Sequence, residues 1–153
     1  MATSIREYIM DNLIASIRNV KKANGYDNDV SDERVFRASP SVDTNAFPSV
    51  YVFEGDEMIV EREMFGSNTK VIKDMEVLVE VWDSSYDDIA ERINSLEADT
   101  IKAIMADSTR GGYASYTEQT GSTPFFIDNN NIGGRIIAFT IRYEHKELDP
   151  YSL

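Results

Sequence analysis

Residues 70–83 read KVIKDMEVLVEVWD, and this stretch decides the fold class. Apolar and charged residues alternate along it with a period of two, which is the period of side chains on a β-strand. Glu76 and Glu80 fall on one face, with Lys70 and Asp74. The other face carries Val71, Met75, Val77, Val79 and Val81. Such alternation is typical of an antiparallel sheet with one covered face.

One amphipathic helix is expected before this strand in the sequence, and a second one after it. Ser4 and Glu7 form a capping-box pattern at the start of the first helix, and Asn24-Gly25 is expected to close it. Its apolar face has helical spacing: Ile5, Ile9, Leu13, Ile17 and Val20. The second helix begins after Ser84 or Ser85 and is expected to end at Gly111-Gly112. Its apolar positions are Ile89, Ile93, Leu96, Ile101 and Ile104.

The remaining apolar runs are short and predict further strands. They lie at residues 33–38, 50–54, 58–64, 124–128 and 135–144, and a tight turn at residues 55–57 would join the second run to the third. Because the strands cluster and do not alternate with helices, we predict an α+β fold: a mostly antiparallel β-sheet with two helices packed on it. At 153 residues, we expect residues 1–153 to form a single domain.

The charge balance excludes several classes of function. The chain has 27 acidic and 15 basic side chains, a formal net charge of −12. This disfavours a sequence-reading nucleic-acid binder, which needs a basic surface, and adsorption on an anionic membrane. No apolar run approaches 18 residues, and Arg6 and Glu7 interrupt the N-terminal stretch, so we expect neither a membrane span nor a signal peptide.

No group of residues predicts catalysis, so we expect no enzyme, no catalytic residue, no cofactor and no metal. The absence of Cys removes thiolate chemistry. His145, the single histidine, follows the last strand between Glu144 and Lys146, and we expect it to be exposed and inert. Residues 27–32 start like a calcium loop but lack its Gly and its final Glu. Trp82 is expected to pack beneath a helix.

Aromatic and Met side chains near the predicted loops suggest an assembly surface. Residues 39–47 and 65–69 are expected to be long loops for so small a chain. The candidate interface residues at or beside these loops, or in a tyrosine-bearing stretch, are Phe47, Met64, Phe65, Tyr113 and Tyr116. Such side chains are favoured in protein–protein contacts. The alternative is that they fold back on the core.

The order of segments resembles a known family. NGYDNDV at residues 24–30 leads into RVFR at 34–37, and FPSVYVFEGD follows at 47–56; MEVLVEV at 75–81 then precedes the second helix. This series is similar to the tail terminator proteins of long-tailed bacteriophages, also called tail completion or minor tail proteins. The resemblance covers about residues 4–107, and residues 113–132 have no matched counterpart.

The resemblance implies a structural role in the virion. Such proteins assemble in the host cytoplasm into a homo-hexameric ring on the head-proximal end of the tail tube. The ring stops polymerisation of the tail tube protein and presents a surface to the head connector or neck protein. DNA passes through the lumen without specific binding, and a wall with net negative charge would repel its phosphates.

Three other interpretations stay open. The chain could be another ring of the neck or tube, such as a head-completion protein or the tube subunit, although residues 39–47 are short for the protruding loop that bridges tube rings. In a different class, an acidic protein can act as an inhibitor that mimics DNA; here the acidic residues are spread along the chain and mixed with Lys and Arg, which weakens this interpretation. A third class is a hydrolase with carboxylate-bound magnesium, but no pair of acidic residues stands out for that role.

Overall fold

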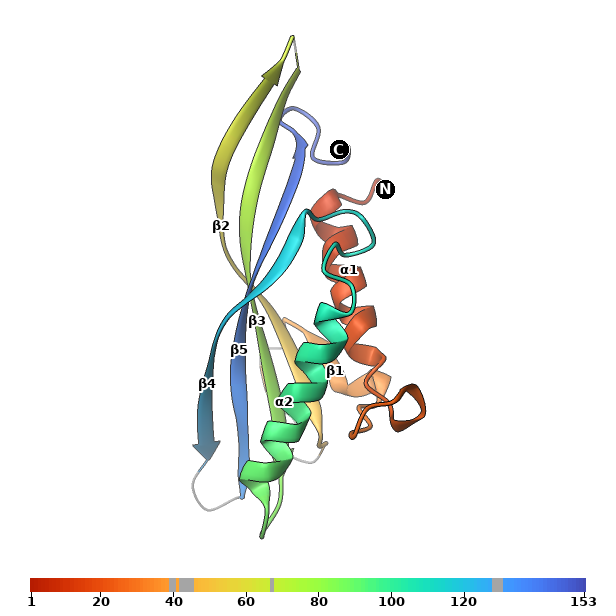
Figure 1. Ribbon diagram of the computed structural model, residues 1–153, viewed down its shortest axis with the longest axis vertical. Helices are drawn as coiled ribbons and strands as arrows, with labels where there is room; N and C mark the ends of the chain where they lie inside the picture. The colour runs from red at the N-terminus through yellow and green to blue at the C-terminus, as the bar shows by residue number, and fades with distance from the viewer. Residues whose placement is uncertain (39–40, 42–45, 67, 128–130) are drawn as a thin grey trace.

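The computed structural model describes residues 1–38, 41, 46–66, 68–127 and 131–153, and it contains one sheet with two α-helices on one face (Figure 1). Its elements are α1 (Ile5–Arg18), the 3-10 turns η1 (Lys22–Asn24) and η2 (Asp32–Arg34), β1 (Val35–Arg37), β2 (Ser49–Phe65), β3 (Asn68–Ser84), α2 (Ile89–Met105), β4 (Tyr116–Ile127) and β5 (Ile132–Lys146). The predicted α+β class is confirmed. Most of the predicted loop at 39–47 lies outside the described residues.

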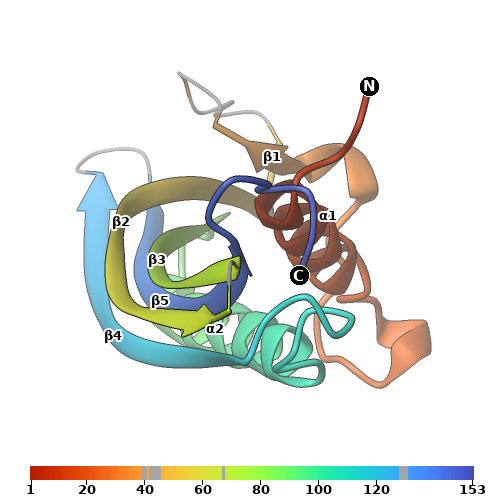
Figure 2. The same ribbon diagram turned by 90° about the horizontal axis from the view of Figure 1, so that it is seen from above.

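The sheet has the strand order β1-β2-β3-β5-β4. The short strand β1 runs parallel to β2, and every other neighbouring pair is antiparallel. The stretch that decides the fold lies within β3, at the centre, where it pairs with β2 on one side and with β5 on the other. Seen from above, the strands form a curved sheet, and both helices lie on the same side of it (Figure 2).

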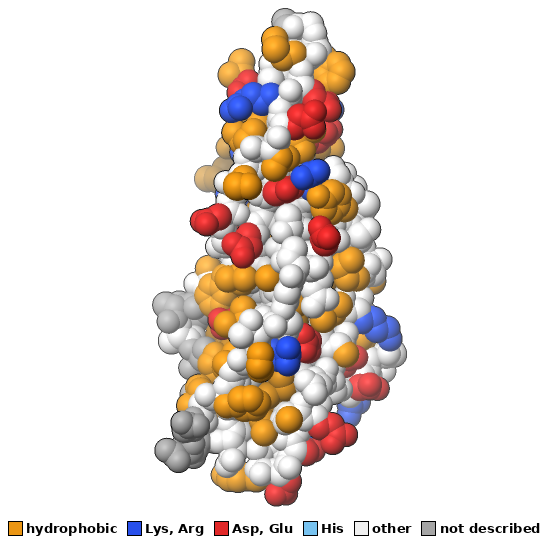
Figure 3. All heavy atoms as spheres, turned by 60° about the vertical axis from the view of Figure 1, so that its left-hand side comes forward, with side chains coloured by type: hydrophobic (Ala, Val, Ile, Leu, Met, Phe, Trp, Pro, Cys, Tyr) orange, Lys and Arg blue, Asp and Glu red, His pale blue; other side chains and the backbone are white. Residues whose placement is uncertain are grey.

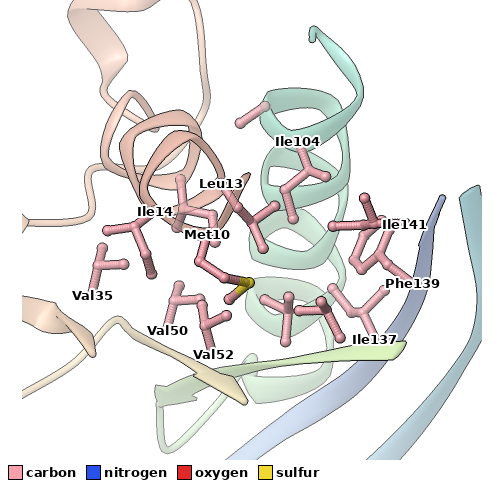
Figure 4. Packing of buried hydrophobic residues seen from close by; sticks show 14 of the residues in the cluster. Met10, Leu13, Ile14, Val35, Val50, Val52, Ile104, Ile137, Phe139 and Ile141 are labelled. Carbon is pink, nitrogen blue, oxygen red and sulfur yellow. The ribbon is translucent and has the colours of Figure 1, made fainter. Parts of the chain in front are cut away.

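The core lies between this sheet and the two helices. Met75, Val77, Val79 and Val81 of β3 are fully buried, as the alternation predicts. They pack in one cluster with residues of α1 such as Met10 and of α2 such as Ile104. Figure 4 shows Met10, Leu13 and Ile14 of α1 directed at Val50 and Val52 of β2, with Ile104, Ile137, Phe139 and Ile141 beside them.

The first helix begins as predicted and ends early. The Ser4 hydroxyl accepts a hydrogen bond from the backbone N–H of Glu7 at 3.2 Å, so the predicted N-cap of α1 is confirmed. The helix ends at Arg18 and not at Asn24-Gly25. Gly25 closes the separate turn η1 instead, with a φ of +87° that suits a glycine.

The second helix also ends before its predicted glycine pair, at Met105. Beyond this end, the fully buried Arg110 donates hydrogen bonds to the Ile104 carbonyl and, at 3.3 Å, to the Ser16 hydroxyl of α1. This side chain therefore joins the two helices at one end.

The acidic segment after α1 is held by a carboxylate of α2. Asp99 of α2 is buried, and its Oδ2 accepts hydrogen bonds from the backbone N–H groups of Asp27 and Asn28 at 3.0 and 2.9 Å. The side-chain amide of Asn28 donates to the same oxygen at 2.7 Å. The segment is therefore docked on α2.

The predicted tight turn at residues 55–57 is wrong, because β2 continues through it. Two β-bulges, between Glu54 and Glu57 and between Ile59 and Glu61, absorb the irregular pattern that the sequence shows there. The chain reverses only at Gly66, which has a φ of +63°, and the pair Phe65–Asn68 closes the hairpin. The predicted long loop at 65–69 is therefore a short hairpin connection.

Two further expectations differ from the structure. The strand expected at residues 124–128 begins at Tyr116, because β4 is a polar edge strand whose exposed residues lack an apolar alternation. Trp82 does not pack beneath a helix. It lies on the opposite, helix-free face of the sheet, where it contacts Tyr51 and Phe125.

We predict that the double variant Val77→Asp/Val79→Asp is unfolded. Both valines are fully buried against the helices, and each buried, unpaired carboxylate costs several kcal/mol against a total stability of about 5–15 kcal/mol. Circular dichroism and thermal melting measure the result. The control is Glu76→Gln on the exposed face of the same strand, which should melt like the wild type. A folded, cooperatively melting double variant would show that this face is not core.

Candidate protein-binding surface

The hairpin of β2 and β3 extends beyond the helices as an arm (Figure 1). Strand β1 pairs with β2 only as far as Val52, so the edge of β2 from Phe53 onward has no neighbouring strand among the described residues. On the other side, β5 supports β3 up to the pair Lys70–Lys146. The arm is therefore three strands wide at its base and two strands wide at its end.

The arm exposes large apolar side chains. Met64 is 77% exposed and Phe65 is 60% exposed, at the end of β2. We call the exposed apolar set the arm tip: Met58, Ile59, Val60, Met64 and Phe65. Glu61, Arg62 and Glu63 lie between its members. Exposed apolar side chains that gather on one element of a small acidic protein mark a site of contact with another molecule.

A polar junction fixes the base of the arm to the body. The carboxylate of Glu57 accepts a hydrogen bond from the hydroxyl of Tyr143 at 2.9 Å and pairs with Lys73 at 2.9 Å and with Arg6 of α1 at 3.4 Å. The Arg6 guanidinium also donates to Glu54 at 2.9 Å. Residues from α1, β2, β3 and β5 meet here, so the junction sets the direction in which the arm leaves the helices.

The junction also perturbs the acidity of its members. Burial raises the pKa of Glu57, but hydrogen bonds from Lys73 and Tyr143 and the nearby charges of Lys73 and Arg6 outweigh burial and hold this pKa below 4.5. Burial and the hydrogen bond to Glu57 raise the pKa of Tyr143 well above its usual value of 10.0. Glu57 is thus ionised and Tyr143 is neutral at neutral pH.

The helix-free face of the sheet divides into two halves. In the half nearer the arm, the outward side chains are mostly charged: Glu61, Glu63, Lys70, Asp74, Glu76, Glu118, Arg142 and Glu144. Arg142 pairs with Asp74 at 2.7 Å, and Lys70 pairs with Glu144 at 2.9 Å. The excess charge in this set is acidic.

The other half of this face is apolar, and we call it the aromatic face: Phe36, Tyr51, Phe53, Leu78, Trp82, Phe125, Ile136 and Ala138. Its rings contact one another across the strands, with Phe36 stacked on Tyr51 at 4.8 Å and Trp82 edge-on to Phe125 at 4.5 Å. The ring of Phe125 occupies the space that a Cβ on Gly134 would need. Figure 3 shows hydrophobic side chains over the lower half of this side of the molecule and again at its upper end.

The five candidate interface residues take different positions. Met64 and Phe65 lie exposed on the arm tip. Phe47 is partly buried against the aromatic face. Tyr113 stacks on Tyr8 of α1 with ring centroids 4.6 Å apart, and the ring of Tyr116 lies 5.3 Å from the guanidinium of Arg142. The structure therefore brings together only the first two, and their contact with a partner stays a prediction.

Part of this surface has no clear signal in the sequence. The sequence predicts a separate strand at residues 58–64, because the two bulges interrupt the alternation and conceal that β2 is continuous. The aromatic residues at 36, 53 and 125 carry no pattern within their own strands. These residues are recognised only by their register with Trp82 and Leu78. That register is known only once the pairing of the strands is known.

The expectation that His145 is exposed is wrong. It is 4% exposed, on the helix side of β5, where its Nδ1 lies 2.6 Å from the carbonyl oxygen of Lys146. Because a carbonyl oxygen only accepts, Nδ1 carries the proton. Nε2 has no hydrogen-bond partner among the described residues, and the ring lines a small hollow with Arg6, Glu57 and Lys73. The segment after β5 returns to α1, where the Pro150 carbonyl accepts a hydrogen bond from the Ile5 N–H at 3.1 Å, and Pro150 lines the same hollow as the imidazole. Sequence alternation does not predict this return.

Neither helix in the described part of the chain is long and apolar enough to span a bilayer. Over the same residues, His, Asp and Glu side chains do not gather in threes at the spacing of a metal site.

Comparison with models of known families gives no match, and comparison with curated proteins gives none either. In contrast, 36 chains of solved structures show similarity to this one. One is a chain described as "Virion of native gene transfer agent (GTA) particle", with a TM-score of 0.43 and 11% sequence identity over 92% of both chains. Similarity at this level does not establish a shared fold.

We predict that Glu57→Gln destabilises the protein at neutral pH by about 1–2 kcal/mol, through loss of charge-assisted hydrogen bonds. A carboxylate whose pKa is lowered by folding stabilises the protein above its unfolded pKa, here 4.5, and loses that contribution as the pH falls through the lower folded value. The difference between wild type and variant should therefore be constant from about pH 7 to about pH 5.5 and shrink below pH 4.5.

Urea denaturation across this pH range measures the difference. Glu76→Gln removes the same charge from an exposed position on β3 and should change stability little at any of these pH values. A Glu57→Gln variant as stable as the wild type at neutral pH would show that the junction does not contribute to folding.

Proposed function

We propose that the protein is a structural component of a bacteriophage virion: a tail terminator that forms a hexameric ring on the head-proximal end of the tail tube. The observation that carries the proposal is the arm, which presents an apolar tip clear of the helices on an otherwise acidic protein. In this role the ring stops addition of tube subunits and offers its other side to the head connector. The work is done by contact and shape.

Three of the four sequence segments that resemble the terminator family lie in the sheet. RVFR contains β1, FPSVYVFEGD contains the start of β2, and MEVLVEV is the centre of β3, whereas NGYDNDV lies between α1 and β1. These are the strands that build the aromatic face and the base of the arm. The resemblance therefore concerns the same elements that form the candidate surface.

A ring also needs two different surfaces on each copy, because a head-to-tail contact joins unlike patches and closes by rotation. The sheet offers unlike surfaces at its two borders. On one side lies the open edge of β2 with the arm. On the other lies the edge strand β4, where the run from Glu118 to Gly121 is exposed and polar.

The acidic half of the helix-free face supports the same role. If this face lines the channel, six copies would present rows of carboxylates such as Glu61, Glu76 and Glu118 to passing DNA. Like charges would repel the phosphates and limit adhesion during ejection.

A second candidate function is the tube subunit itself, and the arm favours it. The sequence offers only residues 39–47 as a protruding loop, whereas the hairpin of β2 and β3 is a long protruding element. A tube subunit adds rings without limit, and a terminator stops at one, so the assembled product separates the two functions.

We predict a ring of six copies, about 104 kDa for a 17.3 kDa chain, in light scattering at high protein concentration with negative-stain images of the same sample. Open tubes would favour the tube subunit. A stable two-fold dimer without rings would contradict both virion functions.

We also predict that Phe65→Ala leaves the monomer folded and weakens self-association by about 1–3 kcal/mol, or roughly 5- to 150-fold. Phe65 is 60% exposed, so its truncation removes little from the core. Sedimentation at several concentrations measures the effect. The control is Tyr86→Ala, which truncates an exposed aromatic side chain away from the arm. Equal association of Phe65→Ala and wild type would remove Phe65 from the interface.

A further inference from the structure

We propose that the arm tip of one copy packs on the aromatic face of a second copy of this chain. The inference rests on the proposed ring and deepens it, because it assigns the surface that receives the arm to the aromatic face and not to the polar edge of β4. Both surfaces are apolar and lie on the same sheet, separated by the charged half of the helix-free face.

The end of the arm, formed by Met64 and Phe65, cannot reach the aromatic face of its own chain. Phe65, at the end of the arm, and Phe53, at the border of the aromatic face, are twelve positions apart on β2. At about 3.3 Å per residue this separates them by roughly 40 Å. The intervening strand is paired with β3 along this length, so the arm cannot fold back. Only a second molecule can bring the two surfaces together.

The chemistry of the two surfaces is complementary. Met58 and Met64 have flexible, polarisable side chains that pack well against aromatic rings. On the aromatic face, Tyr51 and Trp82 are buried, and the partly exposed rings of Phe36, Phe53 and Phe125 pack against them. The rings that a methionine of another copy could contact are therefore these three phenylalanines. The Glu80 carboxylate on this face is already engaged, since it accepts a hydrogen bond from Trp82 Nε1 at 3.2 Å.

The overall charge favours this contact over others. Each copy carries a net charge of −12, so most pairs of surfaces on two copies repel each other. The arm tip would bring Glu61 and Glu63 to this contact with Arg62 between them, and the aromatic face would bring Glu80, so apolar atoms would meet there with few like charges. The contact is head-to-tail, because each copy uses its arm on one side and its aromatic face on the other.

Disulfide trapping tests the contact directly, since the chain has no Cys. We expect an oxidised mixture of Met64→Cys and Leu78→Cys to give a covalent dimer. The control mixture pairs Met64→Cys with Ala90→Cys, which places the thiol on an exposed position of α2, and it should stay largely uncrosslinked. Equal crosslinking in the two mixtures, or none in either, would overturn the inference.

Complementation of charged variants provides the second test. The variants Met64→Glu/Phe65→Glu and Leu78→Glu should each be monomeric, because each lacks one half of the contact. Mixed together they should form a one-to-one dimer of about 35 kDa and nothing larger, since one intact arm meets one intact aromatic face. Ala138→Glu, on the neighbouring strand, replaces Leu78→Glu if the latter fails to fold by circular dichroism.

The outcomes separate this inference from the proposed function. Open filaments that retain the Met64–Leu78 crosslink would support the contact and contradict the terminator. Rings that form without this crosslink, and that tolerate the charged variants, would leave the ring standing and overturn the contact. Charged variants that self-associate like the wild type would overturn it as well, and would show that the arm binds a different protein or that the chain's own residues cover the aromatic face.

Discussion

The sheet is longer than the helices that cover it, and the rest of the structure depends on this mismatch. Strands β2 and β3 have 17 residues each, about 56 Å at 3.3 Å per residue. Helix α1 has 14 residues and α2 has 17, about 21 and 26 Å at 1.5 Å per residue. Two helices of this length cannot cover the whole of one face. The uncovered part of the hairpin becomes the arm, and its apolar residues stay in contact with solvent.

A bare hairpin of this kind is only marginally stable in water, so its base must be held. The fold meets this need with β5, which flanks β3 almost to the end of the arm, and with the junction at Glu57. The segment after β5 adds a further contact, because the backbone N–H of Glu147 donates to the Thr69 carbonyl at 2.8 Å. The arm is thus a supported extension of the sheet and keeps a defined direction relative to the helices.

Sequence reasoning predicts the elements whose side chains repeat regularly. The alternation in β3 and the helical spacing in α1 each follow from a single buried face, so they indicate the class of fold and the main core. Sequence reasoning fails where the bounds of a strand depend on its pairing with a neighbouring strand. The bulges of β2 break its period, and β4 is an edge strand without an apolar pattern, so neither strand can be bounded from its own residues. Alternation puts Trp82 on the face of β3 opposite Val81, but only the packing of both helices on the Val81 face shows that the Trp82 face carries no helix.

The charged residues beside the arm tip explain how an exposed apolar surface is tolerated before assembly. Glu61, Arg62 and Glu63 interrupt the apolar side chains, and charges in such positions oppose unspecific edge-to-edge association. Repulsion between the charges of two copies acts at long range. Salt screens this repulsion beyond a Debye length of about 8 Å at physiological ionic strength. Apolar contact between the arm tip and a partner is short-ranged and is not weakened by this screening. If copies of the chain associate through the arm, as proposed, added salt lowers the repulsion between them without lowering the attraction between their apolar surfaces. This association would then become stronger with salt, whereas association through ion pairs would become weaker.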